Sequence, residues 1–158
     1  MSNISDYQNR TFDILAFQPS GGSAELAQTL ANDSSSGLIC TGIQKLSQRW
    51  VLEFLTPVGS MPYIAARGSS FMANVRAGRV RNNVDVLSFF SIAASEVGTN
   101  LINEDATSDP DDERYSSASL QGFSINTDGK LVLDVIILSA AGTARKVIFP
   151  INVSAGLI

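Results

Sequence analysis

Residues 131–138, Leu-Val-Leu-Asp-Val-Ile-Ile-Leu, form an apolar run that only one acid, Asp134, interrupts. A run of this kind is typical of a central β-strand that is covered on both faces. The Asp128–Gly129 pair before it tolerates the positive φ angles of a tight hairpin, so residues 115–125 should pair with the run antiparallel. The C-terminal part of the chain is therefore expected to build a sheet.

A third strand is expected over residues 145–151, after a turn at residues 140–143. Its apolar face would consist of Val147, Phe149 and Ile151. Pro150 cannot donate a ladder hydrogen bond, so this strand should lie at a sheet edge, where another chain could add. Asp134 should have a cationic or backbone donor partner, because burying a carboxylate unpaired would cost several kcal/mol.

Two amphipathic helices are expected before the sheet. One covers residues 38–54, with an apolar face of Ile39, Ile43, Leu46, Trp50 and Phe54. Asn82 or Asn83 can cap a longer one over residues 84–103, with an apolar face of Val86, Phe90, Ala93, Val97 and Leu101. A short helix could lie within residues 70–81. Two helices laid across a three-stranded antiparallel meander give an α+β fold of two layers.

A dense cluster of turn residues lies between the helices, over residues 55–71. Pro57 ends the preceding helix, and Pro62 stiffens the path that follows. Gly59 and Gly68 can adopt backbone angles that are closed to other residues. The cluster is expected to be a connector of fixed shape, which suits recognition better than catalysis.

The first 37 residues are interpreted as an N-terminal extension, and residues 38–158 as the main domain. Side chains of residues 11–17 alternate in the way that is typical of a β-strand, which residues 19–22 should end. Ser23 could cap a short helix over residues 24–31.

Composition excludes several classes of function. The chain of 158 residues has no histidine, which removes the commonest general base, the usual zinc ligand and the imidazole of serine and cysteine hydrolases. Its single cysteine, Cys40, is expected to be a buried and inert thiol on a helix. The chain has neither a membrane-length apolar run nor the charge order of a secretory signal, so a soluble protein made in the cytoplasm, without a membrane partner, is expected.

Charge is unevenly distributed along the chain. The net charge is −4, and six of the fifteen acids fall in one segment: Glu104, Asp105, Asp109, Asp111, Asp112 and Glu113. Alternation of three of them could suit a divalent cation, but the glycine and the distant glutamate of an EF-hand loop are missing, so a solvated loop or a basic partner is favoured. Four arginines gather at positions 67, 76, 79 and 81. The acidic pI of 4.7 argues against nucleic acid and favours a protein interface or intramolecular pairing for them.

The order of these motifs resembles the baseplate wedge family of contractile phage tails, whose members are also called sheath initiators and have carried a tail lysozyme-like label. The resemblance covers roughly residues 38–151. Its most specific parts are Leu55-Thr56-Pro57 with Gly59, then Gly68 with Phe71, then Glu113-Arg114 leading into Leu120, Gly122 and Ile125. The family's Glu-Pro-Arg motif is represented here by Glu113 followed directly by Arg114.

The resemblance implies a non-enzymatic structural protein of the virion, assembled in the host cytoplasm. Several copies, six in the usual tail, would surround the tail tube. Each copy would dock on other baseplate wedge proteins through Glu113, Arg114, Pro57, Gly59 and Gly68. Sheath subunits would add strands to the meander at Val147, Phe149, Ile151 and Asp134. No cofactor or metal is implied, and counterparts in type VI secretion machines belong to the same family.

Two other functions remain open on the sequence. The first is a peptidoglycan-degrading, lysozyme-like tail enzyme that uses Glu53, Glu96 or Glu113, and it requires two carboxylates that converge at roughly 5–10 Å. The second is an oligomeric capsid or neck component.

Overall fold

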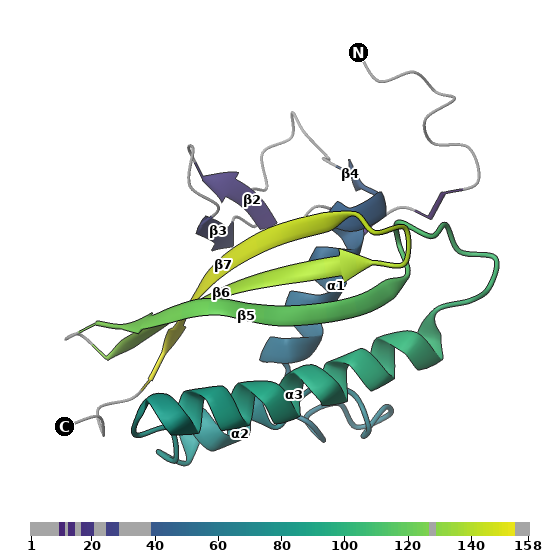
Figure 1. Ribbon diagram of the computed structural model, residues 1–158. Coiled ribbons are helices and arrows are strands. Elements are labelled where there is room, and N and C mark those ends of the chain that lie inside the picture. The colour runs from purple at the N-terminus through teal and green to yellow at the C-terminus, as the bar shows by residue number, and fades with distance from the viewer. Residues whose placement is uncertain are drawn as a thin grey trace.

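The computed structural model describes residues 10–11, 13–14, 17–20, 25–28, 39–126 and 129–153. One sheet lies across helices α1 and α3, and their facing side chains share a single hydrophobic core (Figure 1). This is the predicted two-layer α+β arrangement.

The predicted meander is present. Strands β5 (Tyr115–Ile125), β6 (Lys130–Ser139) and β7 (Ala144–Asn152) pair antiparallel in sequence order. Gly129 has a φ of +70°, as the hairpin prediction requires, whereas Asp128 lies outside the described residues. Every second residue of β6 is fully buried, namely Leu131, Leu133, Val135 and Ile137.

The opposite face of β6 is only partly buried, so the prediction of a strand covered on both faces is wrong. Val132, Asp134, Ile136 and Leu138 lie on that face. Their apolar character suggested a second covering layer, but the helices share a core with one face of the sheet only.

The sheet has two further strands from the N-terminal segment. β2 (Phe17–Ser20) and β3 (Glu25–Gln28) pair antiparallel, and β3 runs parallel to β7 with Glu25 opposite Ile148. The strand order is β2-β3-β7-β6-β5. The prediction that β7 lies at the sheet edge is therefore wrong at Ile148, because a distant part of the same chain pairs there.

Two local predictions in this segment are also wrong. Residues 25–28 form β3 and not part of a helix over 24–31, since so short a helix is marginal alone and β2 and β7 offer backbone partners. β2 continues through Pro19 and Ser20, where a break was predicted, and an edge strand such as β2 tolerates proline. Residues 12, 15–16, 21–24 and 29–38 lie outside the described residues.

Two short strands that precede α1 form a separate two-stranded sheet. β1 (Asp13–Ile14), within the predicted strand 11–17, pairs antiparallel with β4 (Ile39–Cys40). The first helix therefore starts at Gly42 and not near residue 38. Cys40 is buried as predicted but lies on a strand, and burial raises the pKa of its thiol.

The helices follow the apolar patterns of the sequence. α1 spans Gly42–Leu55, α2 Phe71–Arg76 and α3 Asn83–Glu104. Asn82 is the N-cap of α3, since its Oδ1 accepts a hydrogen bond from the backbone N–H of Asp85 at 3.0 Å. All five residues of the apolar face predicted for α3 are buried. None of the helices in the described part of the chain is long and apolar enough to cross a bilayer.

An aromatic cluster joins the helices to the sheet. Trp50 stacks on Phe54 with ring centroids 4.9 Å apart, and Phe54 meets Phe149 of β7 edge-on at 5.8 Å. Phe71 and Phe90 complete the cluster around Phe54. Such aromatic pairs add to the stabilisation that burial alone provides. Trp50 is thus a core residue, as its place on the apolar face of α1 indicates.

Candidate functional site

Glu113, a predicted docking residue, lies inside the molecule. Its side chain is 2% exposed, and its Oε1 accepts a hydrogen bond from the backbone N–H of Gly42 at 3.1 Å. Its Oε2 lies 3.2 Å from Lys45 Nζ and accepts a hydrogen bond from the Thr11 hydroxyl at 2.5 Å. A carboxylate is favourable at a helix N-terminus, where backbone N–H groups point outward. Glu113 therefore joins the segment before β5 to the start of α1 and to Thr11.

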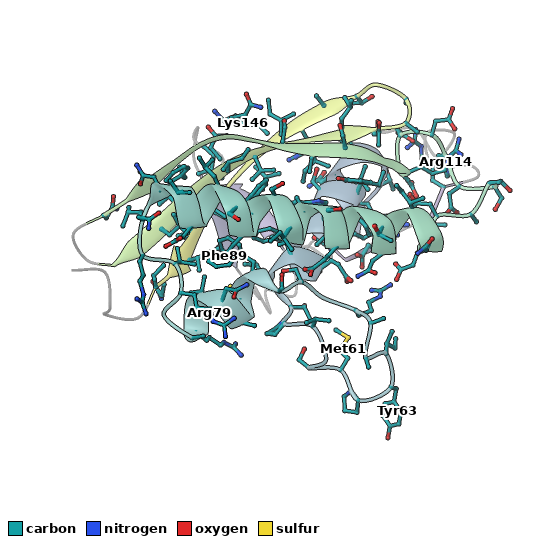
Figure 2. All side chains as sticks on the ribbon, turned by 60° about the horizontal axis from the view of Figure 1, so that its bottom comes forward. Met61, Tyr63, Arg79, Phe89, Arg114 and Lys146 are labelled. Atoms are coloured by element: carbon teal, nitrogen blue, oxygen red, sulfur yellow. The ribbon has the colours of Figure 1, made fainter. Side chains whose placement is uncertain are left out.

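Arg114, labelled in Figure 2, is partly exposed. Its guanidinium forms an ion pair with Asp111. The backbone of this loop also supports the β6–β7 turn. Ala140 N–H donates to Arg114 O at 2.9 Å, and Ala141 N–H donates to Asp111 O at 3.0 Å. The loop holds the sheet in place as well as bearing a partly exposed cation.

Most acids of the segment 104–113 form intramolecular ion pairs. Asp105 lies 3.0 Å from Arg49 and also accepts the Tyr115 backbone N–H at 2.7 Å. Glu104 pairs with Arg49 and Arg67. Within the described ranges, no group of three or more acids, cysteines or histidines is placed to hold a metal ion. The segment is more closely tied to the fold than a solvated loop would be.

Glu53 of α1 binds the backbone of the turn cluster. It is 4% exposed, and its Oε1 accepts hydrogen bonds from Gly68 N–H and Asn100 Nδ2, both at 2.8 Å. Arg67 Nη1 lies 3.5 Å from the other oxygen. A second carboxylate, that of Glu96 on α3, accepts the Ser70 backbone N–H at 2.7 Å. The C-terminal end of this helix-to-helix connection, residues 68–70, is thus bound to both α1 and α3.

The backbone of the cluster closes on itself. Ser69 N–H donates to Thr56 O at 2.8 Å, and Val58 N–H donates to Ser69 O at 3.1 Å. Gly68 has a φ of +100°, and a Cβ built there would lie 2.4 Å from Thr56 O, so only glycine fits. Pro57 and Ser69 form an isolated β-bridge. Gly59 has a φ of +78°, and its backbone N–H donates to Ala65 O at 3.1 Å. Pro57, Gly59 and Gly68 therefore shape the connector, as predicted. Pro57 and Gly68 lie at its base, and Gly59 belongs to its exposed part.

The tip of the connector, residues 58–66, is exposed at every position. We call it the 58–66 loop. Its apolar side chains are widely exposed: Val58 is 49% exposed, Met61 39%, Tyr63 98% and Ile64 53%. Figure 2 shows Tyr63 pointing away from the body of the protein. The sequence predicted the turns, but the apolar tip was missed. The signal for it was present, because Met61, Tyr63 and Ile64 are large apolar residues within a cluster of turn residues.

A groove of about 410 Å³ runs between α3 and β5. Leu87, Phe90, Ser91, Ala94 and Ser95 line it from α3, and residues 115–120 line it from β5. Burial raises the pKa of Tyr115 in this lining. Among the described residues, β5 pairs with β6 alone, so the groove borders a sheet edge with unpaired backbone groups.

The predicted strand-addition residues lie elsewhere. Val147, Phe149 and Ile151 are 5%, 2% and 3% exposed and belong to the core between sheet and helices. Asp134 lies on the other face of the sheet and forms an ion pair at 2.7 Å with Lys146 of β7. Lys146 is labelled in Figure 2. The prediction of a cationic partner for Asp134 is confirmed, and the partner is intramolecular.

Comparisons with protein-family models, with curated proteins and with solved structures found no match to this chain.

Proposed function

We propose that this protein is a non-enzymatic component of a contractile phage tail baseplate, which docks on the wedge proteins and starts sheath assembly by accepting a β-strand. Several copies, six by analogy with the usual tail, would stand around the tube. The proposal begins from the order and spacing of the motifs between residues 38 and 151.

The open edge of β5 is the observation that carries the mechanism. β5 is eleven residues long and has no second neighbour among the described strands, whereas β7 is met by β3. A strand added to β5 would satisfy its unpaired N–H and C=O groups. Alternate side chains of that strand could enter the groove along Leu87, Ala94 and Leu120. The acceptor in this proposal is thus β5 instead of β7.

The roles of three glutamates favour a structural protein over the alternative of a lysozyme-like enzyme. Glu53, Glu96 and Glu113 accept hydrogen bonds from three different backbone N–H groups, those of Gly68, Ser70 and Gly42. Each carboxylate is thereby engaged in holding backbone: Glu53 and Glu96 hold the turn cluster at residues 68 and 70, and Glu113 holds the start of α1. A retaining or inverting glycosidase needs two carboxylates that face one substrate bond.

A variant that fills the groove tests strand addition. Ser91 is exposed on α3 and lines the groove, so Ser91→Trp should obstruct the incoming strand while leaving the core intact. Tails made with this variant should contain the protein in their baseplates but carry no sheath. Immunoblots of purified particles measure the first property, and electron microscopy measures the second.

Ser88→Trp is the matched control, because Ser88 is also exposed on α3 but does not line the groove. It should give normal sheaths. Full-length sheaths on Ser91→Trp particles would contradict the β5 mechanism. Clearing of purified cell walls by the wild-type protein, lost in single glutamate variants, would instead support the enzyme.

A further inference from the structure

We propose that the 58–66 loop is the contact through which this protein docks, and that its partner is a concave apolar pocket on another baseplate protein. This inference rests on the function proposed above. It assigns docking to the tip of the connector, in particular Met61, Tyr63 and Ile64, instead of the buried or half-buried residues Glu113, Gly68 and Pro57.

The surface of the loop is apolar and uncharged. Residues 58–66 read Val-Gly-Ser-Met-Pro-Tyr-Ile-Ala-Ala and contain no ionisable group apart from the Tyr63 hydroxyl. The cation that follows the loop directly in the sequence, Arg67, forms ion pairs with Glu53 and Glu104. Tyr63 is 98% exposed and the adjacent Ile64 is 53% exposed, so an aromatic ring and an aliphatic side chain both place apolar surface in water, which is unfavourable. Contiguous apolar side chains of this kind mark an interaction site.

The loop has a fixed shape before any partner binds. Gly68 N–H is held by Glu53, and Ser70 N–H is held by Glu96. Asn100 Nδ2 adds a hydrogen bond to Ala66 O at 3.2 Å, and Gly59 N–H donates to Ala65 O across the loop. Two partly or fully buried carboxylates and an amide therefore hold the C-terminal end of this exposed loop and the residues that follow it. Preorganisation of this kind lowers the entropy lost on binding.

The chemistry of the loop selects the kind of partner. A protruding apolar tip fits a recess, and a buried tyrosine is a common hot spot of protein interfaces. An anionic lipid surface or a nucleic acid would require basic side chains beside the apolar ones, and the cation at the base of this loop is already neutralised. A neutral pocket on a protein is the partner that remains.

The test uses full-length protein supplied to a phage that lacks its own copy of the gene. The double variant Tyr63→Ser and Ile64→Ser removes the two most exposed large apolar side chains of the loop. Its urea unfolding midpoint should match that of the wild type, because neither side chain is buried. Its amount in purified baseplates, measured by immunoblot, should fall about tenfold or more.

The control is the double variant Val84→Ser and Ile102→Ser, which removes apolar side chains that are 72% and 57% exposed on α3. It should enter baseplates as the wild type does. Equal amounts of loop variant and wild type in baseplates would overturn the inference and leave the proposed function standing. Absence of the wild-type protein from baseplates would overturn both.

Two measurements on the purified protein separate the other partners. Sedimentation of the wild type and the loop variant should give the same mass, and vesicles of phosphatidylglycerol should bind neither. A self-association that the loop variant loses would assign the loop to a second copy of this chain. Vesicle binding that the loop variant loses would assign it to a lipid surface, and either result would overturn the inference.

Discussion

At the scale of single residues, two glycines of the connector show that a residue can be restricted by its backbone dihedral angle, by the space around it, or by both. Gly59 and Gly68 both have positive φ, of +78° and +100°. A Cβ on Gly59 would meet nothing within 4 Å, whereas a Cβ on Gly68 would lie 2.4 Å from Thr56 O. The first position is therefore restricted only by its dihedral angle, and the second also by a close approach of the backbone.

Gly59→Ala should lower the free energy of unfolding by about 1 kcal/mol, the cost of a left-handed conformation for an L-residue. Gly68→Ala should lower it by at least about 3 kcal/mol, since the backbone must also move away from the new methyl group. Urea denaturation of the two variants beside the wild type measures both values. Equal losses would show that the closed base of the connector does not resist the added atom.

At the scale of elements, two adjacent asparagines at the start of α3 allow a second matched comparison. Asn82 is the N-cap and accepts the Asp85 N–H, while Asn83 is the first helical residue and is exposed. Asn82→Ala should lower the free energy of unfolding by about 1 kcal/mol, and Asn83→Ala should change it by less than about 0.5 kcal/mol. Thermal or urea unfolding provides the comparison. A larger loss from Asn83→Ala would contradict this assignment of the cap.

Elements with a strong local pattern could be predicted from the sequence. The apolar face of α3 and the three strands of the meander depend on periodicity and turn residues within the element itself. The strand neighbours of β7 depend on residues 25–28, more than a hundred positions away, where the local pattern favoured a helix. Pro150 correctly indicated a poor ladder donor, but not which segment would lie beside it.

The candidate site was only partly predictable for the same reason. The backbone preferences of Pro57, Gly59 and Gly68 predict a loop of defined shape. The burial of Glu113 depends on Gly42 and Lys45, some seventy residues earlier, so its charge alone suggested a surface contact. A charged pair in a sequence does not reveal whether its partner belongs to the same chain.

At the scale of the whole molecule, Glu113 connects three separate parts of the chain. Its carboxylate meets Thr11 from the N-terminal segment and Gly42 and Lys45 from α1, and it stands just before β5. The neighbouring loop supports the β6–β7 turn through Arg114 O. Loss of this one carboxylate should therefore affect residues that are far apart in sequence.

Glu113→Ala should lower the free energy of unfolding by about 3 kcal/mol, because it leaves Lys45 and the first N–H of α1 without their buried partner. Hydrogen exchange should accelerate in the first turn of α1 and in β4, and remain slow in the centre of α3. The control is Asp111→Ala, which removes a pair on a side chain that is 64% exposed and should cost less than about 1 kcal/mol. If exchange accelerated only next to residue 113, the carboxylate would be a local contact, and the cohesion of the N-terminal segment with α1 and β5 would have to come from the β1–β4 and β3–β7 pairs alone.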